Sequence, residues 1–523
     1  MLRITGYSDK YSVHPGEKVK FYINSETNEN YEVQIVRLIH GDTNPEGPGY
    51  KEEELGASCN GNYEGRNQRI HGGSYVIIPQ DDRMNVESFT LQAYIFPTTP
   101  DKGKQGILTK WNETNSSGYG LFVDDDSCLS LMIGDGDGQV FKISSEKKLM
   151  RKVWYLVAAS FDAETGKVIL YQEPTVTPTN GGLGMSLLHP ADETSAIVES
   201  SNNIKPGKND SPLLMAASTV VDRSGRHITG GHYKEALTPV ELPEQGFVYN
   251  GKIDRPRLSN KALSKDEIKN LASGYGGCTS DLRTKVVGAW DFHANITKNI
   301  ASTFIVDLSP SHLNGFIVNL PCRGMTGYNW TADDIVYHHK PEEYGAIHFH
   351  DDDIDDARWE VDFVYDVPDK IKSGVYAARL RINGDDSSET EDFVPFIIKP
   401  PKGKATSKLA LIVPTNSYMA YSNDNLGTNS VVAQLLAGKV PVLAASDLYL
   451  NEHREYGLST YSLHSDGSGV CYSSRLRPIL NMRPKYRHWL SPSLWQLNGD
   501  LHLTDWLEEK GFEFDCLTDE DLH

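Results

Sequence analysis

Six short apolar stretches between residues 88 and 174 decide the fold of this 523-residue chain. Their apolar side chains alternate with polar ones or form short unbroken runs, and turn-forming residues separate the stretches. Such patterns predict β-strands, and strands at these short intervals predict an antiparallel sandwich. The stretches are SFTLQAYIFP (88–97), GILTKW (106–111), GYGLFVDD (118–125), CLSLMIGDG (128–136), VWYLVAASFD (153–162) and KVILYQEP (167–174).

The order of these stretches resembles that of a laminin-G or concanavalin-like jelly roll. The resemblance rests on three features in this order. They are a strand that ends at Trp111, the sequence Gly-Tyr-Gly-Leu, and Trp154 near the start of a later strand. The stretch GKIDRPRLSNKALSKDEI (251–268) fits the usual exit of this fold, a last strand followed by a short helix. We therefore predict such a jelly roll over residues 81–275, with both tryptophans in its core.

The segments on either side of the predicted jelly roll also have strand patterns. Residues 19–23 alternate polar and apolar side chains, and residues 358–368 and 374–382 have the pattern of two strands of a sandwich. The patterns predict one β-sandwich part over residues 1–80 and a second over residues 276–404. Because each part has few strands for a stable sheet, the two are hypothesised to form one sandwich into which the jelly roll is inserted.

The pattern changes after residue 405 to that of an α/β domain. Residues 409–414, LALIVP, form a continuous apolar run, which predicts a strand buried on both faces of a parallel sheet. A helix is expected around Thr504–Lys510, with Thr504 as its N-cap, and a strand over 512–516. Residues 405–523 are thus predicted to begin a flavodoxin-like α/β domain. They are too few to complete one, so the natural chain is expected to continue past His523.

The composition excludes several classes of function. The formal net charge of -20 leaves no basic footprint for nucleic acid and disfavours binding to anionic membranes. The six cysteines are widely spaced, without a CxxC pair, which indicates reduced thiols. The N-terminus lacks an apolar signal segment, and no apolar run has the length of a membrane helix. We expect a cytoplasmic protein that binds neither nucleic acid nor membrane.

Two stretches are candidates for a functional site. Residues 414–423, PTNSYMAYSN, directly follow a predicted strand, where ligands bind in open α/β sheets. Residues 455–484, EYGLSTYSLHSDGSGVCYSSRLRPILNMRP, form a long irregular segment rich in polar and aromatic side chains. Long irregular segments inside a domain are usually functional or disordered, and the apolar content here argues against disorder. His348 and His350, beside Asp351, are instead expected to lie on the surface.

These two stretches resemble the large (beta) subunit family of N,N-dimethylformamidase. So do GYSDKYSVHPGEKVKF (6–21) and VRLIHGDTNPEGPGYKEE (36–53), and the likeness covers essentially the whole chain. The resemblance implies an iron-dependent hydrolase of small N-substituted linear amides, with N,N-dimethylformamide giving dimethylamine and formate. It also implies a small helical partner subunit and further oligomerisation.

The resemblance further implies the ligands of one iron ion, two tyrosines and a glutamate. Tyr461 matches one tyrosine, and either Tyr418 or Tyr421 matches the other. The glutamate belongs to a His-Pro-Glu motif, which is absent from these 523 residues. The third ligand is therefore expected beyond residue 523, and this chain alone is expected to be inactive. Phenolate and carboxylate oxygens suit a hard cation such as ferric iron.

Other residues of the long segment receive expected roles. His464, three residues after Tyr461, is a candidate catalytic residue that carries a proton. Arg475 and Arg477 are expected to fasten the segment through ion pairs. Two alternatives to this function stay open. The protein could be a related amidase with another substrate, since a fold does not fix its function. It could also be a jelly-roll protein that binds carbohydrate or protein without catalysis.

Overall fold

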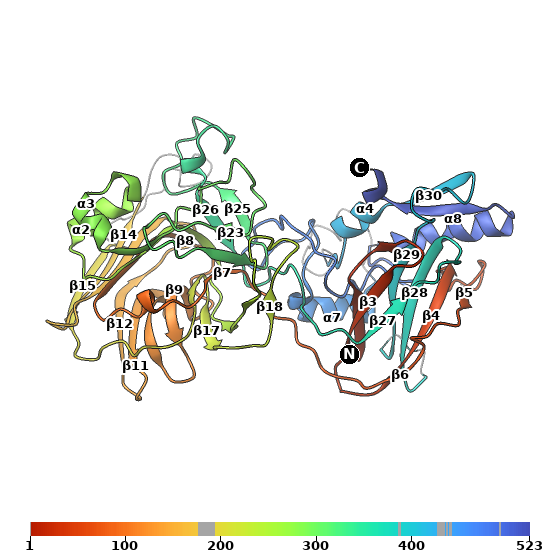
Figure 1. Cartoon of the computed structure of the whole chain (residues 1–523), viewed down its shortest axis with the longest axis horizontal. Coiled ribbons are helices and arrows are strands. Elements are labelled where there is room, and N and C mark those ends of the chain that lie inside the picture. Colours follow the sequence, from red (N-terminus) through yellow and green to blue (C-terminus); the bar gives the residue numbers. More distant parts are fainter. Residues whose placement is uncertain are drawn as a thin grey trace. The chain divides into compact units, whose positions relative to one another are not determined.

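The computed structural model of the chain is mostly β-structure and divides into two compact units (Figure 1). Unit 1 comprises Met1–Gly72 and Ile354–His523, and unit 2 comprises Gly73–Asp353. Each unit has its own sheets and its own apolar core. Among the described residues, no helix is long and apolar enough to cross a membrane. The described residues are 2–175, 194–384, 387, 389–425, 435, 438, 442–490 and 493–522.

Unit 2 is a sandwich of two large, mainly antiparallel sheets. The first contains β7 (Tyr75–Ile78), β9 (Gln105–Asn112), β10 (Ser117–Val123), β11 (Cys128–Asp135), β12 (Val140–Lys148), β16 (Leu213–Met215), β17 (Ser218–Val221), β20 (Glu244–Gly246), β23 (Phe304–Ile305) and β24 (Gly315–Val318). The second contains β8 (Phe89–Pro97), β13 (Tyr155–Phe161), β14 (Lys167–Pro174), β15 (Ala196–Ser201), β21 (Gly251–Ser259), β22 (Val286–Ala289), β25 (Cys322–Met325) and β26 (Ala346–Phe349). The remaining elements of the described part of unit 2 are a pair of short strands and short helices: β18 (His227–Ile228), β19 (Val240–Glu241), η1 (Asp82–Met84), α2 (Lys265–Ala272), η2 (Tyr275–Gly277), α3 (Ser280–Thr284) and η3 (Pro341–Glu343).

Alternation along the strands builds the core between these two sheets. Phe89 and Leu91 of β8 point into it, and Phe89 stacks on Tyr119 of the opposite sheet with ring centroids 4.5 Å apart. Tyr94 of the same strand packs on the other face, in a cluster that includes side chains of α2. Burial of apolar side chains on both faces of this sheet is a main source of its stability. Trp111 and Trp154 are both buried, as predicted.

The predicted boundaries of the jelly roll are too narrow. Strands between residues 286 and 349 pair with jelly-roll strands: β22 and β26 pair with β21, and β24 pairs with β7. The assignment of all of residues 276–404 to a second sandwich part is therefore wrong for its first half. A strand pattern shows that a segment is extended but not which distant strand it joins. Residues 176–193 of the predicted jelly roll lie outside the described residues.

Unit 1 contains a sandwich whose strands come from the segments before and after unit 2 in the sequence (Figure 1). β3 (Lys18–Ser25) pairs antiparallel with β27 (Phe363–Asp366), and β4 (Tyr31–His40) pairs antiparallel with β28 (Gly374–Ile382). The segments before and after the jelly roll therefore share sheets, as the hypothesis of an inserted jelly roll requires. The strands are β1 (Ile4–Ser8), β2 (Ser12–Val13), β3 (Lys18–Ser25), β4 (Tyr31–His40), β5 (Lys51–Glu54), β6 (Gly61–Tyr63), β27 (Phe363–Asp366), β28 (Gly374–Ile382) and β29 (Glu391–Ile398).

The C-terminal part of unit 1 begins with a strand that pairs in parallel with another strand about a hundred residues later. β30 (Leu409–Val413) pairs with β31 (Phe514–Thr518), and α8 (Leu497–Glu509) precedes β31. Phe514, Cys516 and Leu501 pack against the sandwich sheet of unit 1. One parallel pair does not define a flavodoxin-like sheet, so that arrangement stays a prediction. Among the described residues, the other elements of this part are α4 (Thr415–Ala420), α7 (Ala445–Glu452), η4 (Arg454–Tyr456) and η5 (Asp519–Leu522).

Two predictions for this part are wrong in detail. β30 is not buried on both faces, because Leu409 and Ile412 are 44% and 43% exposed and, among the described residues, β30 pairs only with β31. The last helix starts at Leu497, and Thr504 lies inside it instead of capping it. The Thr504 hydroxyl donates to the carbonyls of Leu501, at 2.9 Å, and Ile39, at 2.7 Å. A threonine that bonds to the preceding turn is compatible with a helix interior.

Candidate functional site

The first candidate segment contains two tyrosines in different environments. Tyr418 lies in α4 and is buried, and its hydroxyl donates a hydrogen bond to the Asp500 carboxylate of α8. Burial and the nearby Asp500 raise the pKa of Tyr418 well above its ordinary value. Tyr421 follows the last residue of α4 and is only partly buried. The two side chains therefore separate, with Tyr418 in the packed core and Tyr421 beside the second candidate segment.

Tyr421 and Tyr461 meet face to face. Their ring centroids are 4.3 Å apart and the ring planes differ by 19°. The Tyr461 side chain is 51% exposed, so the pair is open to solvent on one side. The hydrogen bond to Tyr461 and, second, burial raise the pKa of Tyr421. The structure thus brings together two of the three tyrosines predicted from the sequence, and it places the third elsewhere.

Backbone contacts explain why two tyrosines forty residues apart in sequence lie together. The backbone N–H and the hydroxyl of Thr460 both donate to the carbonyl of Ala420, each at 3.0 Å. The Asn481 amide donates to the carbonyl of Tyr421 at 2.7 Å. Each bond involves a residue in or next to the tyrosine pair. These hydrogen bonds fix the backbones that carry the two rings.

Asn423, two residues after Tyr421, also connects the two candidate segments through hydrogen bonds. Its backbone has a φ of 57°, a left-handed conformation that Asn tolerates better than most residues. Its side-chain amide donates to the carbonyls of Tyr456, at 3.0 Å, and Pro478, at 2.9 Å. Its side-chain carbonyl accepts the backbone N–H of Leu480 at 2.7 Å. One buried asparagine therefore joins three segments around the pair.

A second aromatic layer borders Tyr421 and was not foreseen from the sequence. Trp495 contacts Tyr421 edge-on, with centroids 5.5 Å apart and an interplanar angle of 89°. His488 stacks on Trp495 with centroids 4.3 Å apart. The His488 Nε2 atom lies 3.7 Å from a carboxylate oxygen of Asp424. No local sequence motif predicts that these residues lie beside the tyrosine pair, because the fold brings them there from distant positions in the sequence.

His464 is buried in a turn three residues after Tyr461. Its backbone N–H donates to the carbonyl of Ser468 at 2.9 Å, and its carbonyl accepts the N–H of Gly467 at 2.9 Å. The neighbouring Asp466 carboxylate accepts the Ser468 backbone N–H at 2.8 Å and the Ser468 hydroxyl at 2.5 Å. The turn is therefore held in shape by its own hydrogen bonds. A role for His464 in proton transfer stays a prediction.

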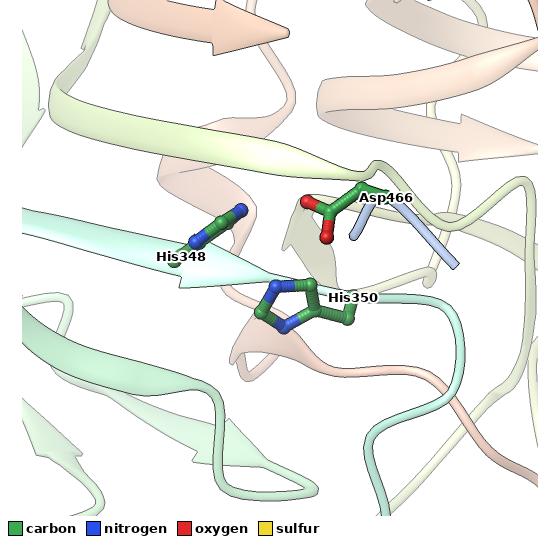
Figure 2. A group of neighbouring side chains, drawn as sticks. All are labelled: His348, His350 and Asp466. Atoms are coloured by element: carbon green, nitrogen blue, oxygen red, sulfur yellow. The ribbon is translucent and has the colours of Figure 1, made fainter. Parts of the chain in front are cut away.

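The pair His348 and His350 lies at the end of β26 in unit 2 (Figure 2). The two imidazole rings are 4.1 Å apart, and both residues are buried. The Nδ1 atom of His350 lies 3.2 Å from a carboxylate oxygen of Asp353, and the same oxygen accepts the Ser74 hydroxyl at 2.6 Å. The expected surface position is therefore wrong, because hydrogen bonds allow these polar groups to be buried. Asp466, also drawn in Figure 2, belongs to unit 1.

The geometry of the tyrosine pair permits metal chemistry. Two phenol oxygens on adjacent rings are hard donors that suit a highly charged cation. A bound cation would displace the phenol protons, as it does for other weak acids. Tyr418 is less suited, because its hydroxyl is already bonded to Asp500 inside the core.

The chain is similar to known proteins over its full length. It is 37% identical, over 528 residues, to the N,N-dimethylformamidase beta subunit of Paracoccus aminophilus, and 37% identical, over 530 residues, to that of Alcaligenes sp.. Each comparison covers 100% of this chain and 65% of the relative, so the chain spans about two thirds of the relatives' length.

Two family descriptions match parts of the chain. Residues 323–523 match the family described as N,N-dimethylformamidase beta subunit-like, C-terminal. Residues 71–203 match the Concanavalin A-like lectin/glucanases superfamily, in agreement with the predicted jelly roll. Among solved structures, a putative carbohydrate binding protein from Bacteroides ovatus is 13% identical. The matched region covers 60% of this chain and 95% of that protein's chain, with a TM-score of 0.29.

Proposed function

Because this chain belongs to the N,N-dimethylformamidase beta subunit family over the part of those proteins that it spans, we propose that it provides catalytic residues of an iron-dependent amidase. The substrate class is small N-substituted linear amides, with formamides first. N,N-dimethylformamide would be hydrolysed to dimethylamine and formate.

The observation that carries this proposal is the stacked pair of Tyr421 and Tyr461. Two tyrosines that only pack do not require their hydroxyls to lie side by side near solvent. Two phenolates that bind the same cation do require this arrangement. Tyr421 and Tyr461 are accordingly the proposed ligands, and the buried hydrogen bond of Tyr418 argues against that residue. The third ligand implied by the family is a glutamate in a His-Pro-Glu motif, which residues 1–523 do not contain.

Iron held by these oxygens would act as a Lewis acid that polarises an amide carbonyl or activates water for hydrolysis. The protein residues supply the surroundings. Trp495 gives the pair an apolar wall that suits a small neutral amide, and no cationic side chain is needed to bind such a substrate. His464 is the proposed carrier of a proton between water and the leaving amine.

Partners and location form part of the same proposal. The relatives are named beta subunits, which supports a complex with a second subunit. The family resemblance implies that this second subunit is small and helical and that the complex oligomerises further. A cytoplasmic location is part of the proposal because the six cysteines are widely spaced, without a CxxC pair, as suits reduced thiols. A sugar-binding protein without catalysis has less support, because Trp111 and Trp154 lie in the core and offer no exposed stacking platform.

The proposal predicts a specific pair of products. The complete gene product, purified together with its partner subunit, is expected to release formate and dimethylamine in equal amounts from N,N-dimethylformamide. Formate can be followed by a coupled dehydrogenase assay and the amine by chromatography. The matched control is the same preparation treated with an iron chelator. Hydrolysis that is confined to another N-substituted amide would favour a related amidase, and no hydrolysis of any amide by iron-loaded protein would refute the proposal.

A further inference from the structure

Arg477 occupies an unusual position for an arginine. Its side chain is fully buried, and among the described residues it forms no ion pair with a carboxylate. The expectation that it fastens the long segment through an ion pair is therefore wrong. Its guanidinium donates instead to five neutral oxygens: the carbonyls of Tyr456 (2.6 Å), Leu458 (3.0 Å) and Ser474 (2.9 Å), and the hydroxyls of Ser422 (2.7 Å) and Ser473 (3.0 Å).

These acceptors come from the two segments that carry the tyrosine pair. Ser422 directly follows Tyr421, and Leu458 lies three residues before Tyr461. One nitrogen, Nη2, donates to both Ser422 and Leu458. The planar guanidinium therefore sets the separation of the two backbones next to the rings. A lysine offers a single nitrogen and cannot reach acceptors in this spread arrangement.

The backbone next to Arg477 leaves space for its side chain. Gly457 has a φ of 78°, which side-chain-bearing residues rarely adopt. A Cβ atom at this position would lie 2.7 Å from Nη1 of Arg477 and 3.0 Å from its Cδ. Glycine at 457 therefore permits both the turn and the close approach of the guanidinium. Burial lowers the pKa of Arg477 to about 10, so the group is still protonated at neutral pH.

We propose that Arg477 is a positioning residue that holds Tyr421 and Tyr461 in the relation needed to share one cation. It does not touch the rings, and it acts through the backbones and hydroxyls on which they depend. Its effect on catalysis rests on the proposed function, but the position of the two rings does not. The inference can therefore be tested without iron.

The test uses the proximity of the two rings. Photo-oxidation with a ruthenium complex and persulfate joins phenols in contact, so the parent chain without metal should yield a Tyr421–Tyr461 dityrosine link, mapped by peptide mass spectrometry. Arg477→Lys should lower the yield of this link about tenfold, because charge-assisted hydrogen bonds to both segments are lost. Arg477→Ala should regain the link when guanidinium is added at low millimolar concentration.

Arg475→Lys is the matched control, because Arg475 donates to the carbonyl of Asp9 and not to either tyrosine segment. It should keep the parental yield. If Arg477 variants fail to fold, Ser422→Ala removes only the hydroxyl acceptor beside Tyr421 and should also lower the yield. Parental cross-linking in Arg477→Lys, or in Ser422→Ala where the arginine variants do not fold, would overturn the inference. If the parental chain gives the link but the complete gene product, purified with its partner subunit, never binds iron, the proposed function is refuted and this inference still stands.

Discussion

Tyr461→Phe is expected to remove iron binding and amide hydrolysis from the complete gene product while leaving its fold intact. The change deletes one phenol oxygen and keeps the ring that stacks on Tyr421. Since half of the side chain is exposed, the free energy of unfolding should change by about 0.5 kcal/mol or less. Loss of a direct ligand should weaken iron binding by about 100-fold or more, beyond the effect of losing an outer partner. Metal titration and the visible phenolate-to-iron band measure this effect.

Tyr418→Phe is the matched control for this experiment. It also deletes one phenol oxygen, but that oxygen is bonded to Asp500 in the core. We expect normal iron content and a loss of about 1 kcal/mol in stability, because Asp500 loses a buried hydrogen-bond donor. The opposite result, with iron lost in Tyr418→Phe and kept in Tyr461→Phe, would show that the assignment of ligands is wrong. Tyr421→Phe should behave like Tyr461→Phe.

Arg483→Met is expected to cause a large loss of stability in unit 1. Asp392 and Arg483 form a buried bidentate pair, with nitrogen–oxygen distances of 2.7 and 2.8 Å. The Asp392 carboxylate also accepts the backbone N–H groups of Gly6, at 3.0 Å, and Phe393, at 2.6 Å. Removing one partner of such a pair leaves an uncompensated buried charge and costs about 3–5 kcal/mol. Hydrogen exchange of the amides in β29 reports this change locally.

The loss should depend on pH in a defined direction. Burial raises the pKa of Asp392 to about 7, although Arg483 and the two backbone amides lower it. A carboxyl whose pKa is higher in the folded state than its ordinary value of about 3.9 destabilises the fold as it ionises. Stability from this group is thus complete below about pH 4 and is lost as the pH rises through 7. Without Arg483 the pKa rises further, so the difference between variant and parent should grow from pH 5 to pH 8.

Asp392→Asn combined with Arg483→Met is the control for the buried charge. The asparagine keeps an acceptor for the backbone amides and carries no charge that needs a partner. The double variant should therefore be more stable than Arg483→Met alone at pH 8. Equal stability of the two variants at that pH would mean that the unpaired carboxylate is not the cause of the loss.

The sequence predicted the strands of this protein better than their partners. Alternation at Phe89 and Leu91 is a local property, and it identified a strand of the jelly-roll core correctly. It could not show that Phe316 would pair with Ile77 across more than two hundred residues, so the boundaries of the jelly roll were wrong. The helix start at Leu497 was missed for a similar reason. Thr504 resembles a cap in sequence, and only the fold supplies the carbonyl of Ile39 that its hydroxyl contacts.

Site residues could be predicted from the sequence where a tyrosine occupies a position that matches a ligand position of the family. That resemblance named Tyr461 and left Tyr418 and Tyr421 open, because both lie in the same short segment. Their separation depends on Asp500, which bonds to Tyr418 from a helix eighty residues away. Trp495 could not be predicted, since no spacing rule links it to Tyr421. Residues that join distant segments therefore have no local signal.

The iron content of the complete gene product tests the central claim most directly. Purified with its partner subunit, the protein is expected to hold one iron ion per copy of this chain, measured by elemental analysis, and to show the phenolate-to-iron band in the visible range. Removal of the iron should abolish both the colour and the release of formate, and restored iron should return them together. Protein that hydrolyses amides at its full rate without iron, or that carries iron without a phenolate band, would contradict the account.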